Sequence, residues 1–302
     1  MNLRHRNSRL VLGTCALAST ALLLTACGSS TSSTPAGTSP AIAKDDAIAA
    51  LVPASVSADG KLAFGTDASY APSEFIDTDG KTVVGFDVDL GKAVAQVLGL
   101  EGTFANAPFD SLIPGVTTSG KFEASMSSFT INPERLKQVN MVSYFNAGTA
   151  WATAKGNPSG VTQDNACGKK IAVQKATVQA DDISARSKKC TDAGKAAIKV
   201  DIYQLQSDAT SAVATNKDDA MLADSPVIAY AIQQTGDKLE QLGDVYDAAP
   251  YGAVVAKNQT DLAKAFQQAF QKLIDSGDYA KILEKWNVQS GAIKTSEVNP
   301  AS

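Results

Sequence analysis

From Lys61 onwards the sequence alternates between strand patterns and amphipathic helix patterns, which limits the chain to few folds. Residues 61–66 form a strand pattern, and residues 86–98 carry apolar side chains at helical spacing. The same order returns later, where residues 170–174 and 220–223 form strand patterns that precede helices. Such alternation is typical of α/β layered domains with largely parallel sheets. We therefore expect an α/β fold that binds ligands beyond the carboxyl ends of its strands.

One cluster of polar residues follows the predicted strand 122–126 and ends at Arg135. Asn132-Pro133 is a helix-start signal, because a capping side chain precedes a residue that needs no N–H donor. Arg135 is therefore predicted in the first helical turn. Three hydroxyl side chains stand just before it: Ser127, Ser128 and Thr130. Hydroxyls, free helix N–H groups and a guanidinium together suit a carboxylate. The alternative is a solvated arginine beside an ordinary capped helix.

Asp224 occupies the matching place in the second half of the chain. It ends the short apolar strand and stands before Ser225-Pro226, where a helix is predicted to begin. The simpler interpretation of Asp224 is a helix N-cap. Taken together, Arg135 and Asp224 offer a cation and an anion from two halves of the chain. That pairing suits the zwitterion of an α-amino acid.

The first 26 residues are predicted to be an export signal. Three arginines precede an apolar run over residues 10–24, which is too short to span a bilayer comfortably. The run ends in Leu24-Thr25-Ala26-Cys27, which is similar to the lipobox of bacterial lipoproteins. We expect a lipid such as palmitate on Cys27, anchorage to the outer face of the cytoplasmic membrane, and a flexible tether over residues 27–57.

The composition of the exported chain excludes several function classes. The only histidine is His5, so the mature protein has no Ser-His or Cys-His catalysis and no histidine-based zinc site. We expect no metal and no other cofactor. Removal of residues 1–26 leaves 24 basic against 31 acidic residues. An acidic exported protein argues against nucleic acid as a partner.

Two cysteines of the predicted folded part, Cys167 and Cys190, are expected to pair, because exported proteins usually oxidise their thiols. The disulfide would close a loop of 24 residues and stabilise the fold by roughly 3 kcal/mol in the chain-entropy model. The alternative is a reactive free thiol.

Several ordered motifs resemble the family 3 extracellular solute-binding proteins of amino-acid ABC transporters. The resemblance covers the chain from about Gly60 to about Val288. The motifs are Gly85-Phe86-Asp87-Val88-Asp89-Leu90 and the stretches 66–72, 109–115, 127–135, 220–226 and 279–286.

This resemblance implies a type II periplasmic-binding fold with two lobes, each a mostly parallel sheet flanked by helices, that close like a hinge. Lobe 1 is expected to comprise residues 58–147 and 253–290, and lobe 2 residues 148–252. The chain is predicted to return to lobe 1 through a crossover strand over residues 251–256. The remaining residues 291–302 are predicted to be a loose tail.

The resemblance also assigns a ligand site. It implies that Arg135 binds the ligand α-carboxylate and Asp224 the α-ammonium, with contacts from the hydroxyl cluster. The other implied contacts come from Asp67, Tyr70, Phe109, Thr177, Val178 and Gln179. Asp67 lies at the distal end of the ligand, which favours a polar or cationic amino acid because a buried carboxylate needs a partner. The alternative is that backbone N–H groups satisfy Asp67. Ser128 stands where many members carry Gly, although members that bind basic amino acids resemble this Ser-Ser pair.

The expected function is that of a monomeric receptor that captures an amino acid outside the cell and hands it to an ABC permease, without chemistry. One alternative is an enzyme on the same scaffold, similar to cyclohexadienyl or arogenate dehydratases. It would need an acid or base near the ligand, and Glu74 is the candidate. Another alternative is a ligand-sensing lipoprotein.

Overall fold

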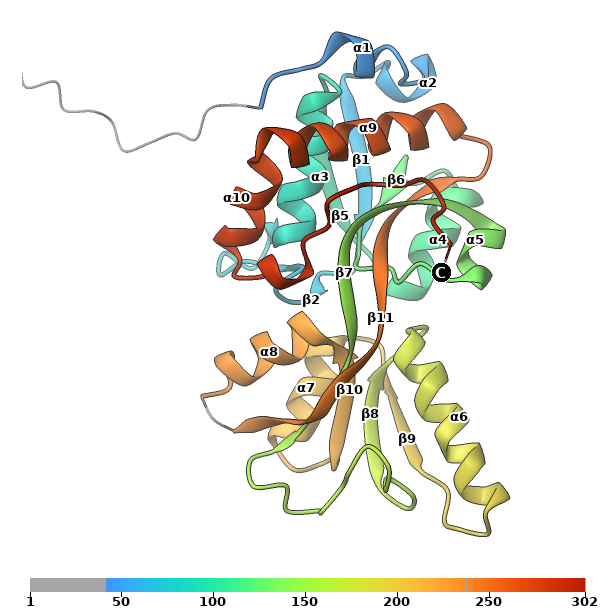
Figure 1. The fold of residues 1–302 in the computed structure, drawn as a ribbon, viewed down its shortest axis with the longest axis vertical. Coiled ribbons are helices and arrows are strands. Elements are labelled where there is room, and N and C mark those ends of the chain that lie inside the picture. The colour runs from blue at the N-terminus through green and yellow to red at the C-terminus, as the bar shows by residue number, and fades with distance from the viewer. Residues whose placement is uncertain (1–41, 237, 302) are drawn as a thin grey trace, which may run out of the picture. The chain divides into compact units, whose positions relative to one another are not determined.

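The structure is a computed structural model, and it describes residues 42–236 and 238–301 (Figure 1). Its larger sheet has eight strands in the order β5-β1-β6-β11-β7-β10-β8-β9. These strands are β1 (Lys61–Thr66), β5 (Glu101–Asn106), β6 (Ala124–Ser125), β7 (Val139–Ala154), β8 (Lys170–Gln174), β9 (Lys199–Tyr203), β10 (Ala220–Asp224) and β11 (Leu239–Ala256). A small sheet contains β2 (Ser69–Tyr70), β3 (Glu74–Ile76) and β4 (Val83–Val84).

Helices flank the larger sheet in both halves of the fold (Figure 1). They are α1 (Asp46–Ala49), α2 (Ala54–Ser57), α3 (Phe86–Val97), α4 (Phe109–Thr117), α5 (Pro133–Gln138), α6 (Val178–Asp192), α7 (Gln206–Ala214), α8 (Ser225–Gln234), α9 (Thr260–Ser276), α10 (Asp278–Lys285) and the 3-10 helix η1 (Gln289–Gly291). The strand-helix alternation expected from the sequence is therefore present.

The sheet forms two lobes that share its two longest strands. In lobe 1, β1 pairs in parallel with β5 and β6, and in lobe 2, β8 pairs in parallel with β9 and β10. The strands β7 and β11 pair with each other antiparallel and extend into both lobes (Figure 1). This is the predicted two-lobed α/β fold. The predicted lobe boundaries, 147/148 and 252/253, fall inside these two strands and stay a prediction.

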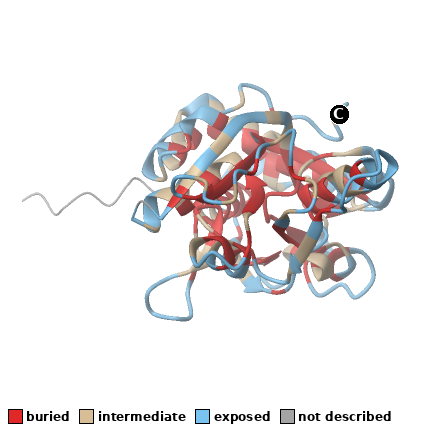
Figure 2. Ribbon diagram, turned by 90° about the horizontal axis from the view of Figure 1, so that it is seen from below, coloured by how far each residue is buried: buried red, intermediate tan, exposed pale blue. Residues whose placement is uncertain are grey.

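The core of lobe 1 lies between the sheet and the helices α3 and α9. The rings of Phe64 and Phe266 lie 5.9 Å apart, and Phe270 packs beside them. Fully burying a side chain of this kind contributes about 1.5–3 kcal/mol. Figure 2 shows the buried segments in the interior and exposed residues on the outer helices and loops. This packing fixes the positions of the strands of lobe 1 and therefore of the residues at their ends.

The folded body begins earlier than the sequence predicts. Much of residues 42–57 was expected to be tether, but α1 and α2 lie here, and Ile48, Val52 and Val56 are buried in the lobe 1 core. Asp45 caps α1, and its carboxylate also binds Lys272 of α9 at 2.8 Å. The apolar positions therefore join the fold, and the predicted tether is wrong over these residues. The predicted signal peptide and Cys27 lie outside the described residues.

The prediction of a loose tail over residues 291–302 is also wrong for its described part. Asn299 N–H donates to Met141 O at 2.7 Å, and Ser143 N–H donates to Glu297 O at 2.9 Å. The side chain of Ser296 is buried and donates to Ser143 O. In lobe 1, β7 has β11 on one side only, so its other edge carries unpaired N–H and C=O groups. The tail satisfies them.

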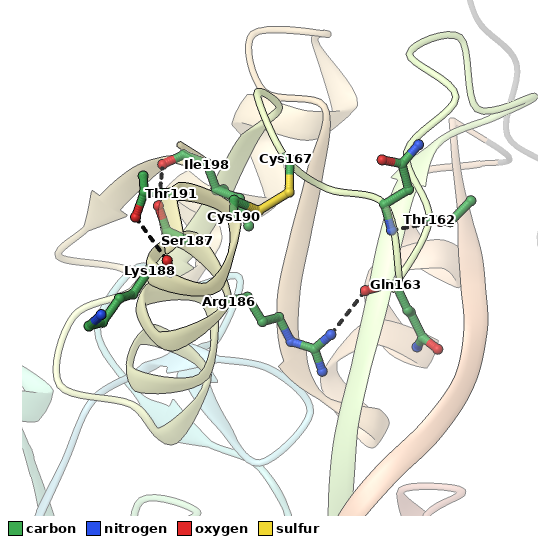
Figure 3. Close-up of a disulfide and its surroundings, with 10 residues drawn as sticks. Thr162, Gln163, Cys167, Arg186, Ser187, Lys188, Cys190, Thr191 and Ile198 are labelled. Atoms are coloured by element: carbon green, nitrogen blue, oxygen red, sulfur yellow. Dashed lines mark hydrogen bonds between the residues drawn. A yellow bond between two sulfur atoms is a disulfide. The ribbon is translucent and has the colours of Figure 1, made fainter. Parts of the chain in front are cut away.

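The predicted disulfide between Cys167 and Cys190 is present (Figure 3). It joins the loop before β8 to the last turns of α6. Beside it, Arg186 donates from Nη1 to Gln163 O at 2.9 Å. Cys190 packs into the apolar core between α6 and the sheet. The bridge therefore ties the end of α6 to the loop that precedes β8.

Candidate ligand-binding site

All eleven predicted ligand-binding residues line one cavity between the lobes. The cavity is lined by Asp67, Tyr70, Glu74, Phe109, Ser127, Ser128, Thr130, Arg135, Gln174, Thr177, Val178, Gln179 and Asp224. Most of them stand at or just beyond the ends of strands, as the α/β pattern predicts. Whether they bind a ligand stays a prediction.

Arg135 is buried in the wall of the cavity. Asn132 caps α5 by accepting from Arg135 N–H at 2.9 Å, and Pro133 occupies the first turn, as predicted. The guanidinium donates to Thr130 O at 2.8 Å and, across the cleft, to Ala176 O at 3.3 Å. Burial lowers the pKa of Arg135 to about 10, while the charges of Asp224 and other acidic groups oppose the shift. The group therefore stays cationic at neutral pH.

Aromatic rings hold this guanidinium in place. Its carbon lies 5.5 Å from the ring centre of Phe109 and 5.4 Å from that of Phe129. The two rings stack on each other at 4.7 Å. Cation–π contacts of this kind are stronger where water is excluded. These contacts fix the position of the Arg135 side chain in the cavity wall.

Asp224 is the acidic counterpart from lobe 2. Asp224 occupies the N-cap position of α8, as the simpler interpretation predicts, but its side chain accepts no hydrogen bond from the helix N–H groups. Instead it accepts from Gln179 Nε2 at 2.8 Å and from the Tyr70 hydroxyl at 3.0 Å. Burial raises the pKa of Asp224, whereas these hydrogen bonds and the charge of Arg135 act in the opposite direction. The carboxylate is buried and faces the same cavity as Arg135.

Two residues of the cavity wall have left-handed backbones. Ser128 has φ 50° and Ala176, next to Thr177, has φ 63°. A residue other than glycine in this region costs about 1 kcal/mol or more and is held by its surroundings. For Ser128 the support is its N–H, which donates to Asp87 Oδ2 at 2.8 Å. A glycine at this position would adopt the left-handed conformation without that cost.

Asp67 is almost fully buried and already has three donors. Its carboxylate accepts from Ser69 Oγ at 2.7 Å, from Phe109 N–H at 2.9 Å and from Gln174 Nε2 at 3.0 Å. Burial raises the pKa of Asp67, and the hydrogen bonds lower it. Only one of these three donors is a backbone N–H. Backbone groups alone therefore do not satisfy Asp67, as the alternative interpretation of this residue would require. Gln174 reaches it from lobe 2.

The remaining contacts of lobe 2 come from the start of α6. Thr177 caps this 15-residue helix by accepting from Ala180 N–H at 3.2 Å, and it donates to Gln174 O at 2.8 Å. Val178 is the first helical residue. The N-terminus of a helix carries free N–H groups and a partial positive charge. This end of the cavity therefore favours an anionic group.

Two cavity residues were not in the predicted ligand set. Gln174 is the last residue of β8, so the strand-end argument used for Asp224 applies to it as well. Glu74 was considered only as an acid or base, and it lies in β3 with its side chain fully buried. Its position depends on contacts with distant segments, which the sequence pattern does not indicate.

In residues 42–236 and 238–301, no group of three or more His, Cys, Asp or Glu side chains is placed to hold a metal ion. Over the same ranges, no helix has the length and apolarity needed to cross a membrane.

The chain is similar in sequence and in fold to known amino-acid-binding proteins. The chain is 36% identical over 253 residues to the arginine-binding protein ArgT of Corynebacterium glutamicum, covering 83% of this chain and 82% of that protein. It also superposes on an ancestral arginine-binding protein bound to arginine, with a TM-score of 0.69, 35% identity and coverage of 75% and 98%.

A second solved structure is an ancestral amino acid-binding protein described as a precursor of cyclohexadienyl dehydratase. The TM-score is 0.69 at 30% identity, with 77% of this chain and 97% of that chain covered. Residues 62–289 match a family model, which spans both lobes and every residue of the cavity. The chain therefore belongs to the bacterial extracellular solute-binding proteins, family 3.

Proposed function

We propose that the protein binds a free amino acid between its lobes and delivers it to an ABC importer. The observation that carries this proposal is the placement of Arg135 and Asp224. The two side chains come from opposite lobes, are buried, and line the same cavity. A buried cation and a buried anion are expensive unless each is paired, and the two ends of an amino acid supply both partners.

The α-carboxylate of the ligand would lie between Arg135 and the start of α6. The planar guanidinium can donate two parallel hydrogen bonds to a carboxylate. The helix N-terminus beyond Thr177 adds a partial positive charge on the other side. Asp224 would take the α-ammonium, which replaces Tyr70 as donor to its carboxylate. Ligand binding thus exchanges contacts between the lobes for contacts through the ligand.

Arginine is the side chain that the cavity supports best. A guanidinium needs acceptors, and the buried carboxylate of Asp67 stands in the cavity beside Gln174. A ligand guanidinium would add a charged partner to the hydrogen bonds that this buried carboxylate already accepts. Several relatives are named arginine-binding proteins, including two from Escherichia coli at 31% and 29% identity. We therefore place a cationic amino acid first.

Isothermal titration of the purified protein with each of the twenty amino acids tests this proposal. We expect arginine to bind most tightly, with lysine and glutamine weaker. Mass spectrometry of ligand released by denaturing the protein is an independent check. Preference for leucine, isoleucine or phenylalanine would contradict a cationic ligand. Absence of binding to every amino acid would remove the proposed function.

The enzyme alternative requires an acid or base that is free to reach the ligand. Glu74 lines the cavity, but its carboxyl group accepts a hydrogen bond from Ser127 Oγ at 2.8 Å and interacts with that of Asp87. These contacts engage the carboxyl group within the protein, which supports binding without chemistry. Incubation with prephenate and arogenate, followed by product analysis, tests this point, and turnover would favour the dehydratase function.

Membrane attachment through Cys27 belongs to the same proposal. The receptor would act as a lipid-anchored monomer outside the cytoplasmic membrane. The supporting observation is the lipobox-like sequence before Cys27. Cys27→Ser should abolish labelling with a palmitate analogue and release the protein from membranes. Retention of the label would contradict the anchor. Co-purification with a permease would distinguish transport from sensing.

A further inference from the structure

Two fully buried acids contact the wall of the ligand cavity, and one of them, Glu74, lines it. Glu74 stands on β3 and Asp87 in the first turn of α3. Both side chains have no exposed surface. Glu74 Oε1 accepts from Ser127 Oγ at 2.8 Å, and Asp87 Oδ2 accepts from Ser128 N–H at 2.8 Å and from the Tyr144 hydroxyl at 2.6 Å. The pair thus contacts both serines of the cavity wall.

One proton placed between the two acids would satisfy the second oxygen of each. The carboxyl groups of Glu74 and Asp87 lie close enough that each shifts the pKa of the other. Glu74 Oε2 and Asp87 Oδ1 receive no hydrogen bond from another donor in the described part of the chain. Two ionised carboxylates have no proton to place between them and repel strongly where water is absent. One of the two must therefore be a carboxylic acid.

The surroundings indicate which acid holds the proton. Asp87 has two strong donors, Tyr144 and Ser128 N–H, which favour its ionised form. Burial raises the pKa of Asp87 to about 6, and these hydrogen bonds counteract the shift. For Glu74, burial and then the charge of Asp87 raise the pKa well above the ordinary value, and the charge of Asp67 acts in the same direction. Glu74 is therefore the protonated member.

The titratable groups around the pair come from every neighbouring element. Asp67 follows β1, Tyr70 lies on β2 and Tyr144 on β7, and burial raises the pKa of both tyrosines well above the ordinary value.

We propose that Glu74 is a neutral carboxylic acid that positions the Ser127–Ser128 wall of the ligand site. It donates its proton to Asp87. Asp87 accepts a hydrogen bond from Ser128 N–H and so stabilises the left-handed backbone of Ser128. Glu74 also accepts from Ser127 Oγ, which in turn accepts from Asp67 N–H at 3.0 Å. The hydrogen bonds form one directed chain from Asp67 through Ser127 and Glu74 to Asp87.

This inference rests on the proposed function, because the Ser127–Ser128 wall matters to a ligand only if the cavity binds one. The effect of a neutral Glu74 on the stability of the fold does not depend on that function. An acid whose pKa is higher in the folded than in the unfolded state loses stabilisation as pH rises above its ordinary pKa. The protein should therefore unfold more easily at pH 8 than near pH 5. Glutamine in place of Glu74 cannot ionise, yet its amide can still donate to Asp87 and accept from Ser127.

The test compares the wild type with Glu74→Gln, Glu74→Ala and a control, Glu101→Gln, whose glutamate is exposed on β5. Thermal unfolding of the ligand-free proteins is followed from pH 5 to pH 8. We expect Glu74→Gln to melt at the wild-type temperature near pH 5 and several degrees higher at pH 8. Glu101→Gln should follow the wild-type profile. Glu74→Ala should melt lower throughout, because Asp87 and Ser127 lose a partner.

The same variants are titrated with arginine at pH 7. We expect Glu74→Gln to bind within about threefold of the wild type and Glu74→Ala at least tenfold more weakly. A Glu74→Gln variant that melts below the wild type at pH 8, or that loses arginine binding tenfold, would overturn the proposal and make Glu74 an anionic group. A wild type that binds no amino acid while Glu74→Gln still shows the expected pH profile would overturn the proposed function alone.

Discussion

The lobes contact each other at the centre of the cavity and again at its rim. The contact at the centre is buried, whereas the contact at the rim is exposed to water. At the centre, Tyr70 of lobe 1 binds buried Asp224 of lobe 2. At the rim, Lys175 binds Asp110 at 2.7 Å with about half of the lysine side chain exposed. The central contact joins a neutral hydroxyl to a buried carboxylate, and the rim contact joins two charged side chains. Exposed ion pairs contribute about 0–1 kcal/mol, whereas leaving a buried polar group without its hydrogen bond costs about 1–3 kcal/mol, and more for a charged group. The centre should therefore determine binding and the rim only adjust closure.

Arg135→Lys is the change with the largest expected effect on this comparison. An ammonium lacks the planar fork that binds a carboxylate through two donors. Losing such a buried charged contact costs about 2–5 kcal/mol, or roughly thirty- to several-thousand-fold in affinity. Titration with arginine measures it, and the melting temperature of the ligand-free protein shows whether the variant folds.

The chain offers a matched control for this substitution. Arg186 is the other arginine of the described residues and binds Asp182 within lobe 2 at 2.9 Å. Arg186→Lys should leave arginine affinity unchanged. Agmatine, which is arginine without its α-carboxylate, should bind weakly to the wild type and lose little more in Arg135→Lys. Equal losses for arginine and agmatine would show that Arg135 does not bind the carboxylate.

The sequence was sufficient to predict the centre of the cavity because its residues follow local signals. The cap at Asn132 and the strand end at Asp224 each depend on a few neighbouring residues. The strands β1 and β8 have the predicted bounds for the same reason.

The sequence was insufficient where a segment depends on distant partners. β7 is buried along nearly all of its 16 residues, so it lacks the alternation that marks a strand with one exposed face. β11 was predicted over 251–256 but begins at Leu239. The ordered tail and the Glu74–Asp87 pair likewise depend on edges and contacts that form only in the folded chain.

Removing the disulfide sharpens the comparison by changing the stability of one lobe without changing the cleft. Neither cysteine lines the cavity. Replacing Cys167 and Cys190 by serine together should lower the free energy of unfolding by roughly 3 kcal/mol, because the unfolded chain regains the freedom of the closed loop. Chemical denaturation measures this loss. Arginine affinity should change less than threefold, and a larger loss would mean that lobe 2 stability, rather than the central contacts, limits binding.

The smallest expected effect is at the rim. Asp110 binds Lys175 and also accepts from Gln204 Nε2 at 3.2 Å, and the lysine lowers the pKa of this aspartate. Because the folded-state pKa is lowered, this contact is present above the ordinary pKa of aspartate and is lost as pH falls below it. Asp110→Asn should weaken arginine binding by at most about 1 kcal/mol at low salt. The difference should shrink further at high salt, since exposed charges are screened. Titrations at both salt concentrations measure it. A loss as large as that of Arg135→Lys would mean that closure at the rim, and not capture at the centre, dominates the affinity.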